Sequence, residues 1–441
     1  EPEVVIASSP TDAGVSCWDI NTGNEFLRCK NCASTSHGLV SVGGRFLASS
    51  QIRENKSSSY GSIFYWSWNK PQVEVKSFPA ESIIPIVSNS EGTYIVGGGA
   101  SGDIYLWEVS SGRLLKKWHA HYRGVTCLEF NDDQSLLISG AEDGCVRVWS
   151  LFRIFDDAKD KSMDLYEHSF HHHSLKVTDV KSGHGFSNAV IVSSSEDRTC
   201  KVWSLGSGKL LRNIVFPSII DAVVLQPCEA GFYAGSRDGK IYIGVLYALS
   251  SSSTSSSDYG AYIAGAFSDH GKAITSLALS ADGNLLVSGS EDGMVRIWDF
   301  QKRTTIRVLR HSKGPVNNVK VIRQKRTVNL DKSMDPAPRK LQGGGGSSSP
   351  SLLPPPLEKF VTPPDENRYV KTRLSGSSDD RWKPVYVSVQ RMEERIKELQ
   401  VYVCSSSDAE EAKLEKVKRD RERWKKLYED LHRYCVDELV D

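Results

Sequence analysis

Residues 145–151 read Cys-Val-Arg-Val-Trp-Ser-Leu, a short strand of alternating hydropathy that closes on a tryptophan. This strand has six other copies along the chain: GVSCWDI (14–20), SIFYWSW (62–68), DIYLWEV (103–109), TCKVWSL (199–205), KIYIGVL (240–246) and MVRIWDF (294–300). In the copy at 240–246, Gly244 takes the place of the tryptophan. A repeat of roughly forty residues built from β-rich units predicts a β-propeller.

The best-preserved repeat predicts four strands for each unit. Its pieces are RLLKKWHAH (113–121), VTCLEF (125–130), LLISGAED (136–143) and CVRVWSL (145–151). Only two strands fit up to Trp18, and only two follow Trp298. Two strands, six sets of four and two more make seven blades of four. We therefore expect an all-β, seven-bladed propeller whose last blade combines a pair of strands from each chain end, which leaves no open edge.

Histidine, serine, aspartate and tryptophan recur at fixed spacing, with the serine four residues before the aspartate and the tryptophan six after it. The sets are His121, Ser139, Asp143 and Trp149; His173, Ser193, Asp197 and Trp203; His270, Ser288, Asp292 and Trp298; and Ser8, Asp12 and Trp18, with His311 from the far end. Over residues 1–325 the chain resembles the WD-repeat family, in which these groups form a buried network. Four copies of the trio favour a structural role over a catalytic one, because an unpaired buried polar group costs ~1–3 kcal/mol.

Three blades depart from this pattern. Ser101 stands where the blade of Trp107 should have its aspartate, the loop before Trp66 is enlarged, and Gly244 lacks an indole. We expect these blades to be less stable and to carry partner contacts, although simple sequence drift is the alternative.

Composition indicates an intracellular protein without a cofactor, a metal or a catalytic site. The chain has 55 basic and 54 acidic residues, so no global field steers it toward nucleic acid or membrane. It has no long apolar run, an acidic start, and nine scattered cysteines that suggest buried thiols. Cys29 and Cys32 form a lone CxxC, and the glycine-rich stretch 97–102 lies between strands instead of opening a helix.

A basic run without acidic residues covers 302–326. It predicts an RNA-contact or nuclear-import patch, with a solvated outer strand and linker as the alternative. The candidate residues are Arg310, Lys313, Lys320, Arg323, Lys325 and Arg326.

Two further regions follow the propeller. Residues 326–384 are rich in Pro, Gly and Ser and predict a largely disordered linker. Residues 385–441 predict two amphipathic, coiled-coil-like helices, for which we expect a homodimer; docking on another protein and folding back on the propeller are the alternatives. The predicted apolar stripe consists of Val389, Met392, Ile396, Leu399, Val403, Leu414, Val417, Trp424, Tyr428 and Leu431.

The opening EVVIASSP (3–10), the following WDI, the two-strand start, the basic last blade and the helical tail together resemble one subfamily. This is the WD-repeat subunit of the rixosome-type complex that matures the large ribosomal subunit, whose plant members are named for defects in root initiation. The resemblance implies a non-catalytic scaffold that binds helical-repeat subunits and docks on pre-60S particles in the nucleoplasm and nucleolus. It also implies a role in removing an internal transcribed spacer from pre-rRNA, and in meristem and root growth.

Two other functions fit a propeller. One is a substrate receptor of a ubiquitin ligase or a chromatin-reading propeller, and the other is an enzyme built on a propeller. An enzyme would need a unique polar cluster outside the repeated sets. The helical tail favours self-assembly over the ligase or chromatin role.

Overall fold

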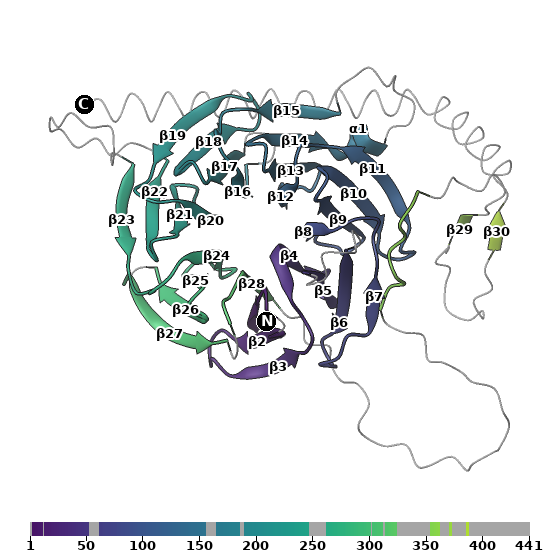
Figure 1. Ribbon diagram of the computed structural model, residues 1–441, viewed down its shortest axis with the longest axis horizontal. Helices are drawn as coiled ribbons and strands as arrows, with labels where there is room; N and C mark the ends of the chain where they lie inside the picture. Colours follow the sequence, from purple (N-terminus) through teal and green to yellow (C-terminus); the bar gives the residue numbers. More distant parts are fainter. Residues whose placement is uncertain are drawn as a thin grey trace, which may run out of the picture. The chain divides into compact units, whose positions relative to one another are not determined.

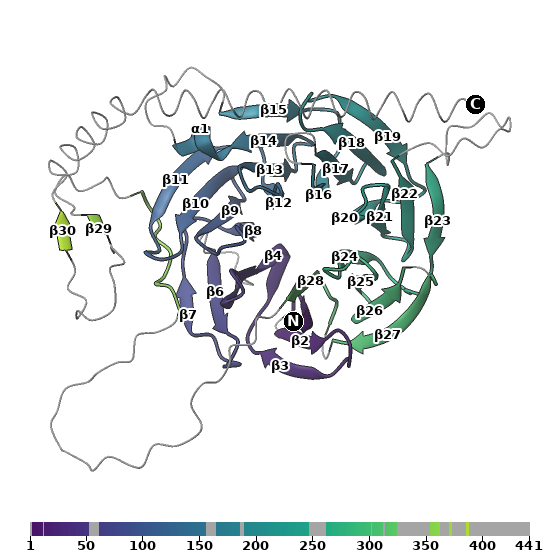
Figure 2. The same cartoon turned by 180° about the vertical axis from the view of Figure 1, so that it is seen from behind.

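The computed structural model describes residues 2–11, 13–52, 61–155, 165–185, 189–246, 262–300, 302–311, 314–323 and 353–361, with the backbone of 370–372 and 385–387. Residues up to Thr362 form one compact unit. That unit is a ring of seven four-stranded antiparallel sheets, seen from its two sides in Figures 1 and 2. The predicted seven-bladed propeller is confirmed.

We number the blades along the chain and give their strands from the centre of the ring outward. Blade 1 consists of β28 (Asn318–Arg323), β1 (Glu3–Ser8), β2 (Val15–Asp19) and β3 (Glu25–Cys29). Blade 2 consists of β4 (Ser34–Val42), β5 (Phe46–Gln51), β6 (Ser62–Ser67) and β7 (Val75–Ser77). Blade 3 consists of β8 (Ile83–Ser88), β9 (Tyr94–Gly99), β10 (Asp103–Glu108) and β11 (Leu114–His119).

The other four blades follow the same order. Blade 4 consists of β12 (Val125–Phe130), β13 (Leu136–Ala141), β14 (Val146–Ser150) and β15 (Tyr166–Phe170), with the short helix α1 (Leu151–Phe155) before β15. Blade 5 consists of β16 (Val177–Ser182), β17 (Val190–Ser195), β18 (Thr199–Ser204) and β19 (Leu210–Val215). Blade 6 consists of β20 (Ile220–Leu225), β21 (Gly231–Ser236), β22 (Ile241–Val245) and β23 (Ile263–Phe267). Blade 7 consists of β24 (Ile274–Leu279), β25 (Leu285–Ser290), β26 (Met294–Asp299) and β27 (Thr304–Arg310).

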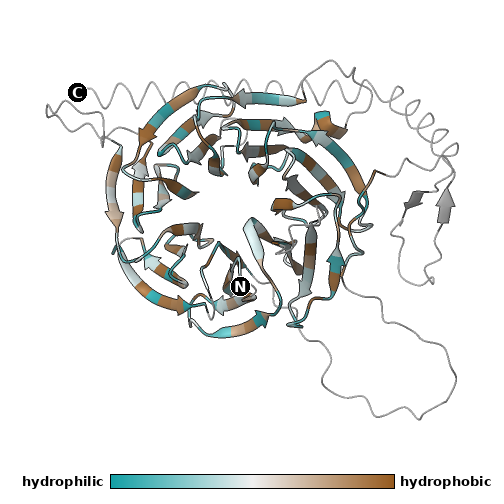
Figure 3. Ribbon diagram, viewed as in Figure 1, coloured by the Kyte–Doolittle hydropathy of each residue, from teal (hydrophilic) through white to brown (hydrophobic). Residues whose placement is uncertain are grey.

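The core lies between neighbouring blades. Ile138 and Val148 of blade 4, for example, pack in one cluster with Val177 and Trp203 of blade 5. The second and third strands are therefore largely buried, which explains why a second strand such as LLISGA (136–141) reads as an almost continuous apolar run. The outermost strands are more exposed: in β27, which carries both hydrophilic and hydrophobic residues (Figure 3), only Leu309 is buried.

Glycine is required in the tight turn between the second and third strands. Gly144 has φ +76°, in the left-handed region that glycine tolerates best. A Cβ atom there would also lie 2.6 Å from the carbonyl oxygen of His173, at the start of the next blade. The turn therefore packs closely against the histidine that serves the neighbouring network.

The two chain ends close the ring, but not in the predicted proportion. β28 pairs with β1 in antiparallel register from Glu3↔Arg323 to Ser8↔Asn318. We expected a pair of strands from each end, and this was wrong: blade 1 takes three N-terminal strands and one C-terminal strand. The reason is that β27 completes blade 7 by pairing with β26, which leaves only β28 for the closing blade.

The structure also differs from the sequence-based expectation beyond β28. Leu353–Val361, within the predicted linker, pack against blades 2 and 3 with Leu353 and Leu357 buried. In the second unit, β29 (Val370–Thr372) pairs with β30 (Val385–Val387), so the first residues of the predicted helical tail form a strand. The whole stripe from Val389 to Leu431 lies outside the described residues.

Closure predicts that one buried residue on β28 supports the whole ring. Val319 is 1% exposed and packs with Val5, Val287 and Val316. Val319→Asp should lower the free energy of unfolding by about 3 kcal/mol or more, because an unpaired carboxylate is buried. The matched control is Arg323→Ser on the same strand, whose exposed ion pair with Glu3 (3.6 Å) should contribute little. Urea denaturation of both variants measures the difference, and equal midpoints would contradict the closure.

Candidate functional site: the blade networks and the interaction surfaces

In blade 5 the predicted residues form one continuous chain of hydrogen bonds. The Trp203 indole N–H donates to Ser193 Oγ at 3.0 Å. Ser193 Oγ lies 2.8 Å from His173 Nε2, and His173 Nδ1 lies 2.9 Å from Asp197 Oδ2. Ser193 is fully buried, so the chain runs through the interior of the propeller.

Blades 4 and 7 repeat this arrangement. In blade 4 the serine oxygen lies 2.8 Å from the indole nitrogen and 2.7 Å from the histidine, and the histidine lies 3.3 Å from the aspartate. In blade 7 the corresponding distances are 2.8, 2.7 and 3.0 Å. The residues are His121, Ser139, Asp143 and Trp149 in blade 4, and His270, Ser288, Asp292 and Trp298 in blade 7. The structure thus brings all three predicted sets together.

The pKa shifts indicate which atom donates and which accepts in these hydrogen bonds. Burial lowers the pKa of His121, His173 and His270, although the neighbouring aspartates partly oppose it. Burial by itself would raise the pKa of Asp143, but the nearby His121 and the hydrogen bond from the Cys145 amide outweigh it and lower that pKa to about 2. In blade 5 the imidazole is therefore neutral and the carboxylate charged, so His173 Nδ1–H donates to Asp197 and Nε2 accepts the Ser193 hydroxyl. In blade 4 the 3.3 Å contact between His121 and Asp143 lacks hydrogen-bond geometry.

This order of groups resembles a catalytic triad, but its surroundings are different. Ser139, Ser193 and Ser288 are fully buried, and each oxygen already accepts a bond from an indole. A nucleophilic serine must reach its substrate. The networks instead pair buried polar groups that would otherwise destabilise the blades.

The closing blade uses different partners. His311 and Trp18 meet edge to face with ring centroids 6.3 Å apart, while Asp12, the third residue of the predicted set, lies outside the described residues. The Ser8 hydroxyl accepts from Asn318 Nδ2 at 3.0 Å. The same Asn318 nitrogen donates to the Thr35 carbonyl at 2.7 Å and so joins blade 1 to blade 2. Sequence reasoning missed this residue, although two adjacent asparagines at the start of a predicted strand were a signal.

In the three irregular blades, other groups replace the serine and the tryptophan. The Trp66 indole lies 3.4 Å from the Lys30 carbonyl of the preceding blade, and the Trp107 indole donates to the Glu358 carbonyl at 2.9 Å. At Gly244 a Cβ atom would collide with the Phe232 ring, which leaves no room for an indole. Two of these blades therefore recruit a partner from outside their own sheet.

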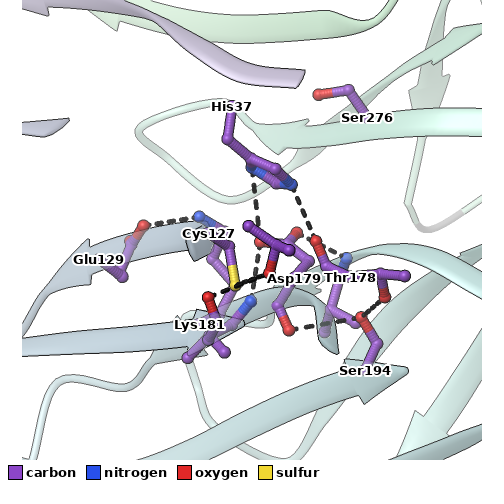
Figure 4. A network of polar contacts seen from close by, with 12 residues as sticks. His37, Cys127, Glu129, Thr178, Asp179, Lys181, Ser194 and Ser276 are labelled. Carbon is purple, nitrogen blue, oxygen red and sulfur yellow. Dashed lines mark hydrogen bonds and ion pairs between the residues drawn. The ribbon is translucent and has the colours of Figure 1, made fainter. Parts of the chain in front are cut away.

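His37 carries a contact across the centre of the ring (Figure 4). β4 advances from Ser34 to Leu39 while its partner strand moves only from Gln51 to Ser49, so the extra residues bulge inward. His37 has φ +54°, and its Nε2 lies 3.0 Å from the Thr178 carbonyl of blade 5. Burial lowers the pKa of His37, although Asp179, with its carboxylate 3.8 Å away, partly opposes this. Blades 2 and 5 are thereby linked directly.

A cavity of about 370 Å³ with a mixed lining lies among the ends of the inner strands. Lys320 and Glu129 line it, and Lys181 donates to Glu129 at 2.7 Å. The neighbouring Lys181 ammonium, together with burial, lowers the pKa of Lys320. Asp132 and His184 also line the cavity, so its charges are mixed. Such a lining suits a polar protein surface better than a polyanion.

The structure separates the predicted basic patch. Arg310 is on the outermost strand of blade 7, whereas Lys320 and Arg323 are on the innermost strand of blade 1. Residues adjacent in the sequence therefore face different parts of the ring. Lys313, Lys325 and Arg326 lie outside the described residues, so RNA or import-receptor contact stays a prediction.

Cys29 and Cys32 are both buried, and burial raises the pKa of Cys29 to about 12. In the part of the chain that the structure describes, no three metal-ligating side chains gather into a cluster. No helix within the described ranges has the length and apolar character needed to cross a membrane.

Seven four-stranded blades, three of them with the Trp, Ser, His and Asp set brought together, define a WD-repeat propeller. The model of the WD domain, G-beta repeat, matches residues 112–150, 165–204 and 262–299. The chain is 49% identical to Protein ROOT INITIATION DEFECTIVE 3 of Arabidopsis thaliana over 98% of both chains. It is 32% identical to WD repeat-containing protein 18 of Homo sapiens over 73% of each chain. It is 30% identical to Pre-rRNA-processing protein IPI3 of Yarrowia lipolytica over 70% of this chain and 73% of that protein. The chain belongs to this family of WD-repeat proteins.

The network predicts a measurable loss of stability from one hydroxyl. Ser193→Ala should lower the free energy of unfolding by about 1–3 kcal/mol, because the Trp203 indole and His173 Nε2 lose their shared partner. Ser207→Ala, in an exposed turn of the same blade, is the control and should change little. Chemical denaturation followed by tryptophan fluorescence compares them. Equal stability of the two variants would show that the network does not hold the blade.

Proposed function

We propose that the protein is a non-catalytic WD-repeat scaffold in large ribosomal subunit maturation, acting in pre-rRNA processing and linked to root development. The observation that carries the proposal is the match over 98% of both chains to a protein named for defective root initiation. Relatives named as pre-rRNA-processing proteins in two yeasts add support. The closed propeller suits this role because it offers a rigid surface to several partners at once.

The proposal also covers where in the cell the protein acts and which molecules it binds. A protein that acts on large-subunit precursors works in the nucleoplasm and nucleolus. We infer that it binds helical-repeat subunits of a maturation complex and docks on pre-60S particles. The basic run that ends in Arg323, Lys325 and Arg326 is the candidate for direct RNA contact or nuclear import.

Affinity purification from nuclear extract tests the proposal. Tagged full-length protein should co-purify precursors of the large-subunit rRNA and their associated proteins, whereas a tagged unrelated propeller should not. Depletion of the protein should cause spacer-containing pre-rRNA to accumulate, measured by hybridisation. Recovery of ubiquitin-ligase subunits or histones without rRNA precursors would favour the receptor or chromatin function. Substrate turnover with no stable partner would favour an enzyme.

We also propose that the tail pairs two copies of the chain. An amphipathic stripe cannot bury its apolar face alone, and the stripe at 389–431 alternates with charged residues. Val389→Glu with Ile396→Glu should therefore convert a dimer into a monomer in light scattering. Glu393→Gln with Glu394→Gln, on the polar side of the same predicted helix, is the matched control. A wild-type monomer would exclude the homodimer and leave docking on another protein.

A further inference from the structure

The segment Leu353–Val361 reads LPPPLEKFV and lies against the outer part of blades 2 and 3 (Figure 1). Three hydrogen bonds hold it there. The Leu357 amide donates to Ser77 Oγ at 2.9 Å and the Glu358 amide to the Gly112 carbonyl at 2.8 Å. The Trp107 indole donates to the Glu358 carbonyl at 2.9 Å. Each bond joins the segment to a different part of the two blades.

Two leucines anchor the segment. Leu353 is 8% and Leu357 5% exposed, and both belong to a cluster with Phe46, Tyr65 and Trp107. Pro354–Pro356 lack amide hydrogens and restrict the backbone, so little conformational entropy is lost on docking. Phe360 is 75% exposed, which places the end of the anchored part near Glu358.

Two glycines of blade 3 make room for the docked segment and leave an indole for it to bind. Ten residues before the tryptophan, blades 4, 5 and 7 carry the serine that accepts the indole bond, whereas blade 3 has Gly97. A glycine offers no hydroxyl, so the Trp107 indole needs an acceptor from elsewhere, and the Glu358 carbonyl supplies it. Gly112 has φ +71°, and a Cβ atom there would collide with the Pro356 carbonyl. Both glycines therefore match the docked segment.

We propose that this groove, lined by Phe46, Ser77, Trp107, Gly112 and Leu114, is a peptide-binding site for a Leu-Pro-Pro-Pro-Leu-Glu sequence. Its occupant is residues 353–358 of the same chain. The groove thus gives the C-terminal region a second attachment to the propeller, in addition to the covalent connection at Arg323. This inference does not depend on the proposed function in ribosome maturation.

The length of the connection favours occupancy within one chain. Residues 324–352 separate β28 from the segment. The sequence predicts a flexible linker over most of this stretch, and a flexible coil of this length has an end-to-end distance of roughly 30 Å. The resulting effective concentration is on the order of millimolar, far above that of a second copy at micromolar protein. A free peptide of the same sequence should therefore compete poorly with the segment of the wild-type protein.

Fluorescence anisotropy with a labelled peptide of residues 350–362 tests the site in the full-length protein. The variant Leu353→Asp with Leu357→Asp should release its own segment and bind the peptide at least tenfold more tightly than the wild type does. The control Phe360→Asp with Val361→Asp, at exposed positions, should behave as the wild type. A peptide that carries the two leucine substitutions should not bind the released variant.

Two results overturn the proposal. One is a released variant that keeps the wild-type thermal transition but does not bind the peptide. The other is a wild-type protein that binds the peptide as tightly as the variant, which means that the groove is empty in solution.

A second measurement covers the case in which the released variant fails to fold. A protease site inserted at Gly343–Gly346 of the wild-type chain allows the linker to be cut after folding. The segment should remain bound at high concentration after cutting and dissociate on dilution. In the uncut protein, protection of the Leu357 and Glu358 amides from hydrogen exchange should not depend on concentration. Loss of this protection on dilution of the uncut protein would assign the occupant to a second copy instead.

Discussion

The antiparallel pairing of β1 with β28 is the contact on which the whole ring depends. Each apolar cluster lies between two blades, so a blade buries its faces only when it has a neighbour on both sides. Blade 1 obtains its innermost strand from the far end of the chain, and Val319 on that strand packs with Val5 and Val287. Without this pairing, blades 7 and 1 would expose apolar faces and open edges. The ring differs in this way from an open repeat array, whose terminal units need polar caps.

A second contact recurs in blades 2, 3, 4, 5 and 7: the indole N–H of the tryptophan on the third strand meets an acceptor. In blades 4, 5 and 7 the acceptor is a serine that a neutral histidine and a charged aspartate hold in place. In blades 2 and 3 the acceptors are the carbonyls of Lys30 and Glu358, which belong to other segments. Two of the three irregular blades are therefore tied to other segments through their tryptophan. In blades 2 and 3, the departure from the repeat pattern coincides with a hydrogen bond from the indole to another segment, and such departures often mark a contact.

Much of this could be predicted from the sequence, because the informative residues repeat. Tryptophan spacing gave the number of blades, and the fixed offsets of serine and aspartate identified three networks that the structure forms. The division of the closing blade was predicted wrongly, since strand counting does not tell which sheet takes β27. The basic residues Arg310 and Lys320 were grouped because they are close in the chain, yet one strand lies outermost and the other innermost. His37, Asn318 and Leu353–Glu358 were missed because they act over long sequence distances and occur once.

The distribution of polar groups explains why a scaffold is the function that this fold supports best. The triad-like groups are buried and pair with one another, and inner-strand groups such as Lys181 and Glu129 also pair. The polar side chains that remain accessible lie at strand ends, on outer strands and in grooves between blades. These places have mixed charge and apolar anchors, as in the cavity beside Lys320 and the groove beside Trp107. Surfaces of this kind recognise extended protein segments by shape and a few hydrogen bonds. A rigid ring with several such places can hold different partners in fixed positions relative to one another. A scaffold subunit of a maturation complex needs this property.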